Sequence, residues 1–281
     1  MGMGALHLSI PPRPSREDAI AVIHHALRCG ITLLDTADCY CADVADTNHG
    51  EKLIRCALDS YGGDTTSVMV ATKAGIVRPN GRWIPRGDPA YLEAAIIRGF
   101  DALGGRKPID LWLLHTPDPN WPVKDSLRAA AAAVRGGLIR QVGLSNVSLD
   151  QIKEAQEVVE IAAIQNRYNL WYRDSEVNGV IAYCERTGMV FMPWSPLGGK
   201  QDHYLLTQIP FFQSLAGRYE VSVYAIALAW IFAKSPCMFP IPGTSRPQHV
   251  DSWIDALNLT LTTQDIYGIE CSVFRAHRHV D

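Results

Sequence analysis

The sequence predicts an α/β fold, a single-domain (β/α)8 barrel that spans residues 1–281. Short aliphatic and β-branched runs alternate with amphipathic stretches along the whole chain, at a spacing of roughly 30 residues that is typical of repeated strand–helix units. No linker interrupts the alternation, and such barrels typically need about 250 residues. A doubly wound open sheet is the alternative. It is disfavoured because no G-x-G-x-x-G follows an early strand.

The helices are predicted from their start signals. Ser15, Asn48 and Ser148 each precede an amphipathic run and have an acidic residue or glutamine three positions later, the spacing of a capping box. Pro89 suits a first helical position. The sixth helix is expected to be continuous over 175–186. The eight predicted helices begin at or just after Ser15, Asn48, Asp88, Pro122, Ser148, Ser175, Val221 and Pro247.

The strands are predicted from apolar runs between these helices. They comprise residues 1–5, 31–34, 68–72, 109–114, 139–144, 161–165, 189–193 and 237–240. Two long connections, 74–87 and 198–215, follow predicted strands, and connections of this length are uncommon unless they bind something or are disordered. Trp83, in the first connection, is therefore a candidate wall of a substrate pocket.

Composition excludes several classes of function. A formal net charge of −3 leaves no basic excess for nucleic acid. No apolar run approaches the roughly 20 residues that span a bilayer, and residues 1–14 have no basic leader, so we expect a cytoplasmic protein that does not bind membranes. The cysteines include no C-x-x-C pair and the histidines have no metal-ligand spacing, so no metal is expected. Cys39 and Cys41 are interpreted as packing groups of a loop.

Four polar residues stand at or just beyond the ends of three predicted strands: Asp35, Tyr40, Lys73 and His115. Burying a charge costs several kcal/mol unless the charge is paired, so an apolar run that ends in an ionisable residue is unusual for packing alone. The carboxyl ends of barrel strands meet on one face, where the active sites of such barrels lie. We therefore expect the four side chains to share one site.

Together these residues suit the reduction of a carbonyl group. Tyrosine has an unperturbed pKa of about 10, which a lysine cation at the hydroxyl of Tyr40 would lower. Asp35 would keep Lys73 charged inside an apolar barrel. His115 could donate a hydrogen bond to the oxygen that Tyr40 protonates. Such a pocket polarises a carbonyl, so that a hydride can arrive at carbon as a proton arrives at oxygen.

The segments that contain these residues resemble the signature segments of the aldo-keto reductases. They read LLDTADCY (33–40), VATK (70–73) and LLHTPD (113–118), and the four residues fall on that family's catalytic tetrad. The resemblance continues, in order, through VGLSN (142–146), IQNRYNL (164–170), PWSPLGG (193–199) and IPGTSRP (241–247). It implies an NADPH-dependent oxidoreductase with a TIM-barrel fold. The family's N-terminal hairpin is shortened or missing, because the chain begins almost at its first strand.

The resemblance also implies the contacts with NADPH (NADP+), residue by residue. Ser145, Asn146 and Gln165 match residues that hydrogen-bond the nicotinamide carboxamide. Trp194 matches an aromatic residue, usually tyrosine, that stacks on the nicotinamide ring. The pyrophosphate and the adenosine 2′-phosphate would be held by Ser195, Leu197, Gly198, Gly243, Thr244, Ser245 and Arg246. A guanidinium fork suits a phosphate, which favours NADPH over NADH.

This sequence departs from the family pattern at four positions. Cys41 follows the tyrosine where the family has glycine, and Gly243 stands where many members have lysine. His249 and Trp253 replace the residues that are commoner near the adenine.

Two other functions fit the same fold. In a class I aldolase, Lys73 would form a Schiff base with the substrate, but Asp35 argues against this because a nearby carboxylate keeps lysine protonated. The second is a regulatory subunit that keeps the fold and the cofactor but acts on a partner protein. The potassium-channel β-subunits look like an example. The main expectation is an enzyme whose partner is a small carbonyl compound. The sequence specifies neither that compound nor the oligomeric state.

Overall fold

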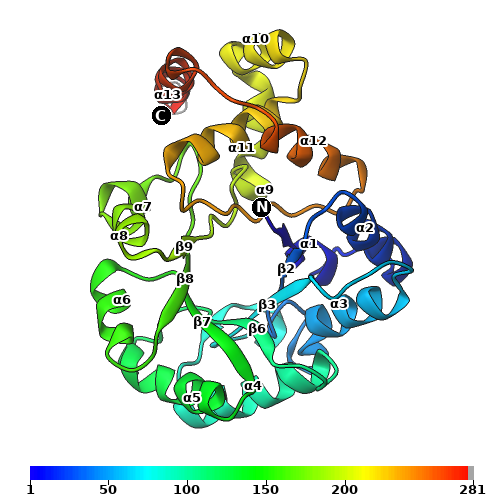
Figure 1. Cartoon of the computed structure of the whole chain (residues 1–281), viewed down its shortest axis with the longest axis vertical. Coiled ribbons are helices and arrows are strands. Elements are labelled where there is room, and N and C mark those ends of the chain that lie inside the picture. The colour runs from blue at the N-terminus through cyan, green and yellow to red at the C-terminus, as the bar shows by residue number, and fades with distance from the viewer. Residues whose placement is uncertain (278–281) are drawn as a thin grey trace.

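Parallel strands surrounded by helices form the barrel (Figure 1) in the computed structural model, which describes residues 1–277. Seven strands are hydrogen-bonded in the order β1-β2-β3-β6-β7-β8-β9, and each neighbouring pair is parallel. They are β1 (Met3–Gly4), β2 (Leu33–Asp35), β3 (Met69–Ala74), β6 (Ile109–Leu114), β7 (Ile139–Ser145), β8 (Ile161–Gln165) and β9 (Val190–Phe191). The structure confirms the predicted (β/α)8 fold class. Within residues 1–277, no hairpin lies ahead of β1.

Residues 237–243 take the place of the eighth strand and close the barrel. The segment exchanges two backbone hydrogen bonds with β9, at 2.9 and 2.7 Å. On its other side, the amides of Gly2 and Gly4 donate to the carbonyls of Pro240 and Pro242 at 3.0 and 2.8 Å. The prediction of a regular strand at 237–240 is wrong, although its position is right. Proline has no N–H to donate, so this extended segment cannot form a complete ladder.

The helices lie outside the sheet (Figure 1), and most begin where the sequence predicts. Ser15 and Asp88 accept hydrogen bonds from the third residue beyond them, and Ser148 with Gln151 forms a full capping box. The main helices are α2 (Arg16–Arg28), α3 (His49–Ser60), α4 (Pro89–Ala102), α5 (Val123–Arg135), α6 (Leu149–Gln156), α7 (Asp174–Val177), α8 (Val180–Thr187), α10 (Pro210–Tyr219), α11 (Val223–Lys234), α12 (Gln248–Leu257) and α13 (Thr263–His277).

Two of the predicted helix details are wrong. Asn48 precedes α3 in a left-handed conformation (φ 65°), and its side chain makes no cap hydrogen bond. Glu51 does not complete a capping box, because its buried carboxylate accepts a hydrogen bond from Thr72 at 2.8 Å. The continuous helix predicted over 175–186 is broken into α7 and α8. Gly179, at φ 82°, interrupts the helical path there.

The two long connections contain short elements that the sequence does not reveal. Residues 74–87 form a small antiparallel hairpin of β4 (Ile76–Val77) and β5 (Ile84–Pro85) around η2 (Pro79–Gly81). Residues 198–215 contain α9 (Gly199–Asp202), η3 (His203–Gln208) and the start of α10. The C-terminal helix α13 also lies outside the predicted pattern. The remaining short helices are α1 (Leu6–Ser9) and η1 (Val44–Asp46).

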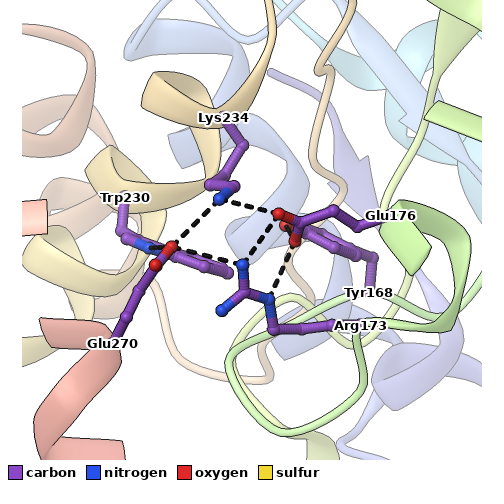
Figure 2. A network of polar contacts seen from close by, with 6 residues as sticks. All are labelled: Tyr168, Arg173, Glu176, Trp230, Lys234 and Glu270. Atoms are coloured by element: carbon purple, nitrogen blue, oxygen red, sulfur yellow. Dashed lines mark hydrogen bonds and ion pairs between the residues drawn. The ribbon is translucent and has the colours of Figure 1, made fainter. Parts of the chain in front are cut away.

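A polar network ties α13 to the barrel (Figure 2). Glu270, on α13, accepts hydrogen bonds from Lys234 at 2.9 Å, Arg173 at 3.3 Å and the indole of Trp230 at 3.3 Å. Glu176, on α7, accepts from the same arginine and lysine. The two carboxylates and two cations therefore connect three helices with one compact set of charge-assisted bonds.

Within residues 1–277, no single helix is long and apolar enough to cross a bilayer. Only α10 and α11 pass that test together, by length and composition alone, and they are bent by 91° relative to each other.

Candidate active site

The pleat of the strands directs the predicted site residues into the barrel. Side chains two positions apart on a strand point to the same face. Leu33, Ala71, Leu111, Leu113 and Ala163 belong to one buried apolar cluster. Asp35, Lys73 and Gln165 each lie two residues beyond a member of that cluster, on β2, β3 and β8, and His115 does so directly after the end of β6. The four polar side chains therefore form the next layer, at the carboxyl ends of the strands, where barrel enzymes carry out their chemistry.

An ion pair between Lys73 and Asp35 lies at the centre of this layer. Lys73 Nζ is 2.7 Å from Asp35 Oδ2, and both residues are 1% exposed. The ammonium also donates to the carbonyl of Thr36 at 2.6 Å, and Gln165 Nε2 donates to Asp35 Oδ1 at 2.8 Å. Both carboxylate oxygens thus have a donor, which is the condition under which a buried pair is tolerated.

Tyr40 lies beside this pair, as the sequence predicts, on the loop after β2. Lys73 Nζ is 4.9 Å from the centre of the Tyr40 ring, and the ring of His115 meets it edge-on at 5.7 Å between centroids. Trp83 reaches in from the β4–β5 hairpin, 6.4 Å from both rings. It is 45% exposed, so it lies between the buried tetrad and solvent. Its place as a substrate wall stays a prediction.

The protonation states of Tyr40 and His115 follow from their burial. Burial, with a smaller effect from the charge of Asp35, raises the pKa of Tyr40 well above its ordinary value. The ammonium of Lys73, which donates to Asp35 and lies 4.9 Å from the ring centroid of Tyr40, does not offset this rise. Burial and the charge of Lys73 lower the pKa of His115 well below its usual range. At neutral pH the site therefore holds a protonated tyrosine and an uncharged imidazole.

Two contacts with the tetrad were missed by the sequence analysis. Cys39 Sγ lies 3.2 Å from Nδ1 of His115, with both side chains buried. The first turn of α3 comes so close that a Cβ on Gly50 would lie 2.1 Å from Oγ1 of Thr36, the residue whose carbonyl holds Lys73. Neither contact has a local sequence signal, since each joins separate segments of the chain.

The residues predicted to bind the nicotinamide lie at or just beyond the ends of β7, β8 and β9. Asn146 donates from Nδ2 to the carbonyl of His115 at 2.9 Å and to Ser145 Oγ at 3.1 Å. Its Oδ1 accepts from the indole N–H of Trp194 at 3.0 Å. These bonds set the orientation of the Trp194 ring next to the tetrad. Gln165 donates one of its two amide N–H groups to Asp35, which leaves its second N–H and its carbonyl for another partner.

The predicted pyrophosphate residues follow Trp194 on a sharply turned backbone. Ser195 (φ 48°) and Gly198 (φ 93°) both adopt left-handed conformations, and Asn169 donates to the carbonyl of Ser195 at 2.9 Å. A Cβ on Gly198 would lie 2.7 Å from the ring of Trp171, so only glycine fits there. Leu197 packs against the main core.

The predicted 2′-phosphate loop lies beyond the barrel-closing segment. Gly243 pairs with Gly4, and a Cβ on Gly243 would lie 2.9 Å from the Gly4 carbonyl, so the lysine common at this position in the family would meet the backbone of β1. Thr244 Oγ1 accepts from the amide of Arg246 at 3.0 Å and lies 3.0 Å from Nδ1 of His249. The side chains of Ser245 and Arg246 are exposed, and Arg246 forms no ion pair within the described part of the chain.

Burial also perturbs two histidines at this end of the site, of which His7 was not predicted. Burial, followed by the charges of His203 and Lys200, lowers the pKa of His7. Burial, followed by the charges of Arg246 and His203, lowers the pKa of His249. His7 lies against Gly243, since a Cβ on that glycine would be 3.2 Å from Cδ2 of the imidazole. The donor set fits a dinucleotide with phosphates at this end and its nicotinamide beside Trp194.

Comparisons with known proteins agree with the motif order. The family model of the aldo/keto reductase family matches residues 1–272. An uncharacterized oxidoreductase of Schizosaccharomyces pombe is 37% identical over 270 residues, covering 94% of this chain and 83% of the relative. Pyridoxine 4-dehydrogenase of Escherichia coli is 30% identical over 275 residues, covering 94% and 91%. An aldo-keto reductase from Klebsiella pneumoniae, solved in complex with NADPH, shares the fold with a TM-score of 0.80 at 20% identity, covering 96% and 89%.

Proposed function

This chain belongs to the aldo/keto reductase family, and on that premise we propose that it is an NADPH-dependent oxidoreductase, a single barrel domain over residues 1–281, that reduces an aldehyde or a ketone to an alcohol in the cytoplasm. One observation supports this reaction most directly: the Lys73–Asp35 pair, at 2.7 Å, lies under a protonated Tyr40 and beside an uncharged His115. That arrangement provides a proton donor, a cation near it and a neutral hydrogen-bond donor in one water-poor pocket.

Bound NADPH would supply the hydride that reaches the carbonyl carbon. Tyr40 holds the proton that the carbonyl oxygen needs, and its raised pKa ensures that the proton is present at neutral pH. As the proton leaves, negative charge develops on the phenol ring, where the Lys73 ammonium at 4.9 Å stabilises it. Asp35 and the Thr36 carbonyl hold that ammonium in place. His115 orients the carbonyl oxygen, and Tyr40 regains its proton from solvent after the alcohol leaves.

Ser145, Asn146, Gln165 and Trp194 would hold the nicotinamide, and Trp83 would cover the substrate. Arg246 would bind the 2′-phosphate, assisted by Thr244, and its exposed guanidinium has no competing ion pair in the described chain. Ser195, Leu197 and Gly198 would hold the pyrophosphate, and Gly243, Ser245 and His249 would complete the adenosine end. The NADPH complex of the Klebsiella protein, which has the same fold, supports the choice of this dinucleotide.

The class I aldolase is less consistent with the site. A Schiff base requires a neutral amine, and Lys73 donates to a carboxylate at 2.7 Å. Borohydride treatment in the presence of substrate should therefore leave Lys73 unmodified, and covalent trapping there would support the aldolase.

The test is an NADPH-oxidation screen with aromatic and aliphatic aldehydes, ketones and pyridoxal. Pyridoxal is included because the E. coli relative is a pyridoxine 4-dehydrogenase. We expect turnover with at least one compound that Tyr40→Phe loses while still binding NADPH. Tight NADPH binding without turnover across the whole panel would favour the regulatory subunit instead.

A further inference from the structure

Three potential metal ligands from the two ends of the chain meet on the outside of the barrel. His25 lies in the last turn of α2, Cys29 is the C-cap residue four positions later, and Asp251 lies in the first turn of α12. His25 Nε2 is 2.7 Å from Asp251 Oδ1, while Cys29 Sγ is 3.6 Å from the histidine nitrogen and 3.8 Å from that carboxylate oxygen. Within residues 1–277 this is the only such group of three or more metal-binding side chains.

The separations are close to those in a zinc site. Zinc binds thiolate sulfur at about 2.3 Å and imidazole nitrogen or carboxylate oxygen at about 2.0–2.2 Å. Tetrahedral angles at these bond lengths put neighbouring ligand atoms roughly 3.3–3.7 Å apart. The Cys29–His25 separation of 3.6 Å lies within this range, and the Cys29–Asp251 separation of 3.8 Å lies just above it. The His25–Asp251 separation must widen by roughly 0.6 Å to reach that range, and the side chain of Asp251, which is 58% exposed, can rotate without disturbing the core.

We propose that His25, Cys29 and Asp251 form a zinc-binding site that links α2 to α12, with three protein ligands and a fourth position open to water. The mixture of nitrogen, sulfur and oxygen donors selects zinc over calcium or magnesium, which require oxygen ligands. Residues at i and i+4 lie on the same helical face, so the last turn of α2 and its C-cap residue present both ligands towards α12.

An ion pair between His25 and Asp251 is the simpler account of their contact, and exposed pairs stabilise proteins little. In that account the thiol adds only a long hydrogen bond to Asp251, at 3.8 Å. A metal would use all three groups. It would also fix the first turn of α12, which follows directly after the loop that contains Thr244 and Arg246.

Cobalt titration of the full, metal-free protein tests the site, with a thiol-free reductant to keep the cysteines reduced. We expect one Co²⁺ per chain and a thiolate-to-cobalt charge-transfer band, which an equimolar amount of Zn²⁺ should abolish. Zn²⁺ should also raise the thermal midpoint, because a ligand that binds only the native state stabilises it. Both readouts are independent of turnover and of NADPH.

Three variants distinguish this site from non-specific binding to thiols. Cys29→Ser should remove the charge-transfer band and weaken Zn²⁺ binding by more than about tenfold, since loss of a mere outer-shell partner already costs 10–100-fold. Asp251→Asn, at an exposed position that the fold tolerates, should keep the band but weaken binding. Cys56→Ser is the control, because Cys56 is an equally half-buried free thiol outside the cluster. A band that survives Cys29→Ser or disappears in Cys56→Ser, or the absence of stoichiometric binding, would overturn the proposal.

Discussion

The thiol of Cys39 contacts the imidazole of His115, with Sγ 3.2 Å from Nδ1 and both groups buried. Burial, reinforced by the charge of Asp38, raises the pKa of Cys39 well above its ordinary value, so the sulfur keeps its proton. When that S–H donates to Nδ1, the proton of the neutral imidazole lies on Nε2, the nitrogen left free for a substrate oxygen. Cys39 therefore has a structural connection to the tetrad, which its interpretation as a packing group did not include.

Removing this thiol should lower turnover modestly. We expect Cys39→Ala to reduce kcat by about 2–10-fold, the equivalent of one neutral hydrogen bond of about 0.5–1.5 kcal/mol, and Cys39→Ser to retain most of the rate. Cys41→Ser is the control, since the Cys41 thiol donates only to the carbonyl of Cys39. Steady-state NADPH oxidation measures all three. Equal kcat values for Cys39→Ala and the wild type would show that the contact does not position His115.

Tyr40→Phe removes the proposed acid but keeps the ring that packs against His115 and Trp83. General acid catalysis typically contributes about 10²–10⁴-fold, so kcat should fall by that factor while NADPH affinity and the thermal midpoint stay nearly unchanged. The measurement combines turnover of a reactive aldehyde with calorimetric NADPH binding. Near-full activity in a folded variant would contradict the mechanism.

Lys73→Met should destabilise the protein as well as abolish turnover. It leaves the buried carboxylate of Asp35 with Gln165 as its remaining side-chain donor in the described structure. Loss of one partner from such a pair costs roughly 3–5 kcal/mol of unfolding free energy, which urea denaturation can measure. Asp35→Asn should cost less activity, because the lysine can stay partly charged. Lys153→Met, at an exposed position on α6, is the control and should unfold like the wild type.

Arg246→Ala should weaken NADPH binding by about 1.5–3 kcal/mol, the value of a charged hydrogen bond, and leave NADH binding nearly unchanged. Arg106→Ala removes another exposed arginine, far along the chain from the loop, and should affect neither cofactor. Calorimetry with both cofactors compares the variants. Equal weakening of NADPH and NADH by Arg246→Ala would sink the assignment of the 2′-phosphate.

The network in Figure 2 should make stability depend on acid pH. Although burial acts to raise it, hydrogen bonds from Arg173, Lys234 and Tyr168 lower the pKa of Glu176 to about 2. A carboxyl group whose pKa is lowered by folding stabilises the fold at pH values above the pKa of the unfolded state, which is about 4.3. This contribution is lost as the pH falls towards 2. Glu176→Gln should therefore be less stable than the wild type at pH 7, and the difference should shrink between about pH 4 and 2.

Urea midpoints across that pH range test the dependence. Glu93→Gln, an exposed position on α4, should show no such convergence. A difference for Glu176→Gln that stays constant down to pH 2 would mean that the carboxylate charge does not stabilise the network.

The barrel and the tetrad were predictable because both leave periodic signals. Side chains alternate between the two faces of a strand, and Lys73 and His115 follow the inward-facing positions of theirs. The direction of both side chains is therefore fixed before any tertiary contact is known. The direction of the Tyr40 pKa shift was not predictable, since it depends mainly on how deeply the hydroxyl is buried, which the sequence does not specify. The break at Gly179 was missed because one glycine in an amphipathic run does not reveal its φ. The His25–Asp251 contact joins residues 226 positions apart, and no local pattern encodes it.

The closure of the barrel through Gly2 and Gly4 has a consequence for how a nascent chain can fold. The partners of these two amides, the carbonyls of Pro240 and Pro242, are each synthesised 238 residues after them (240 − 2 and 242 − 4). Until then β1 has no neighbour on one side, and unpaired strand edges invite association with other chains. Contacts of such long sequence separation are also slow to form. We therefore expect the last step of folding to be the docking of the 237–243 segment between β9 and β1, with the tetrad already assembled on the strands between them.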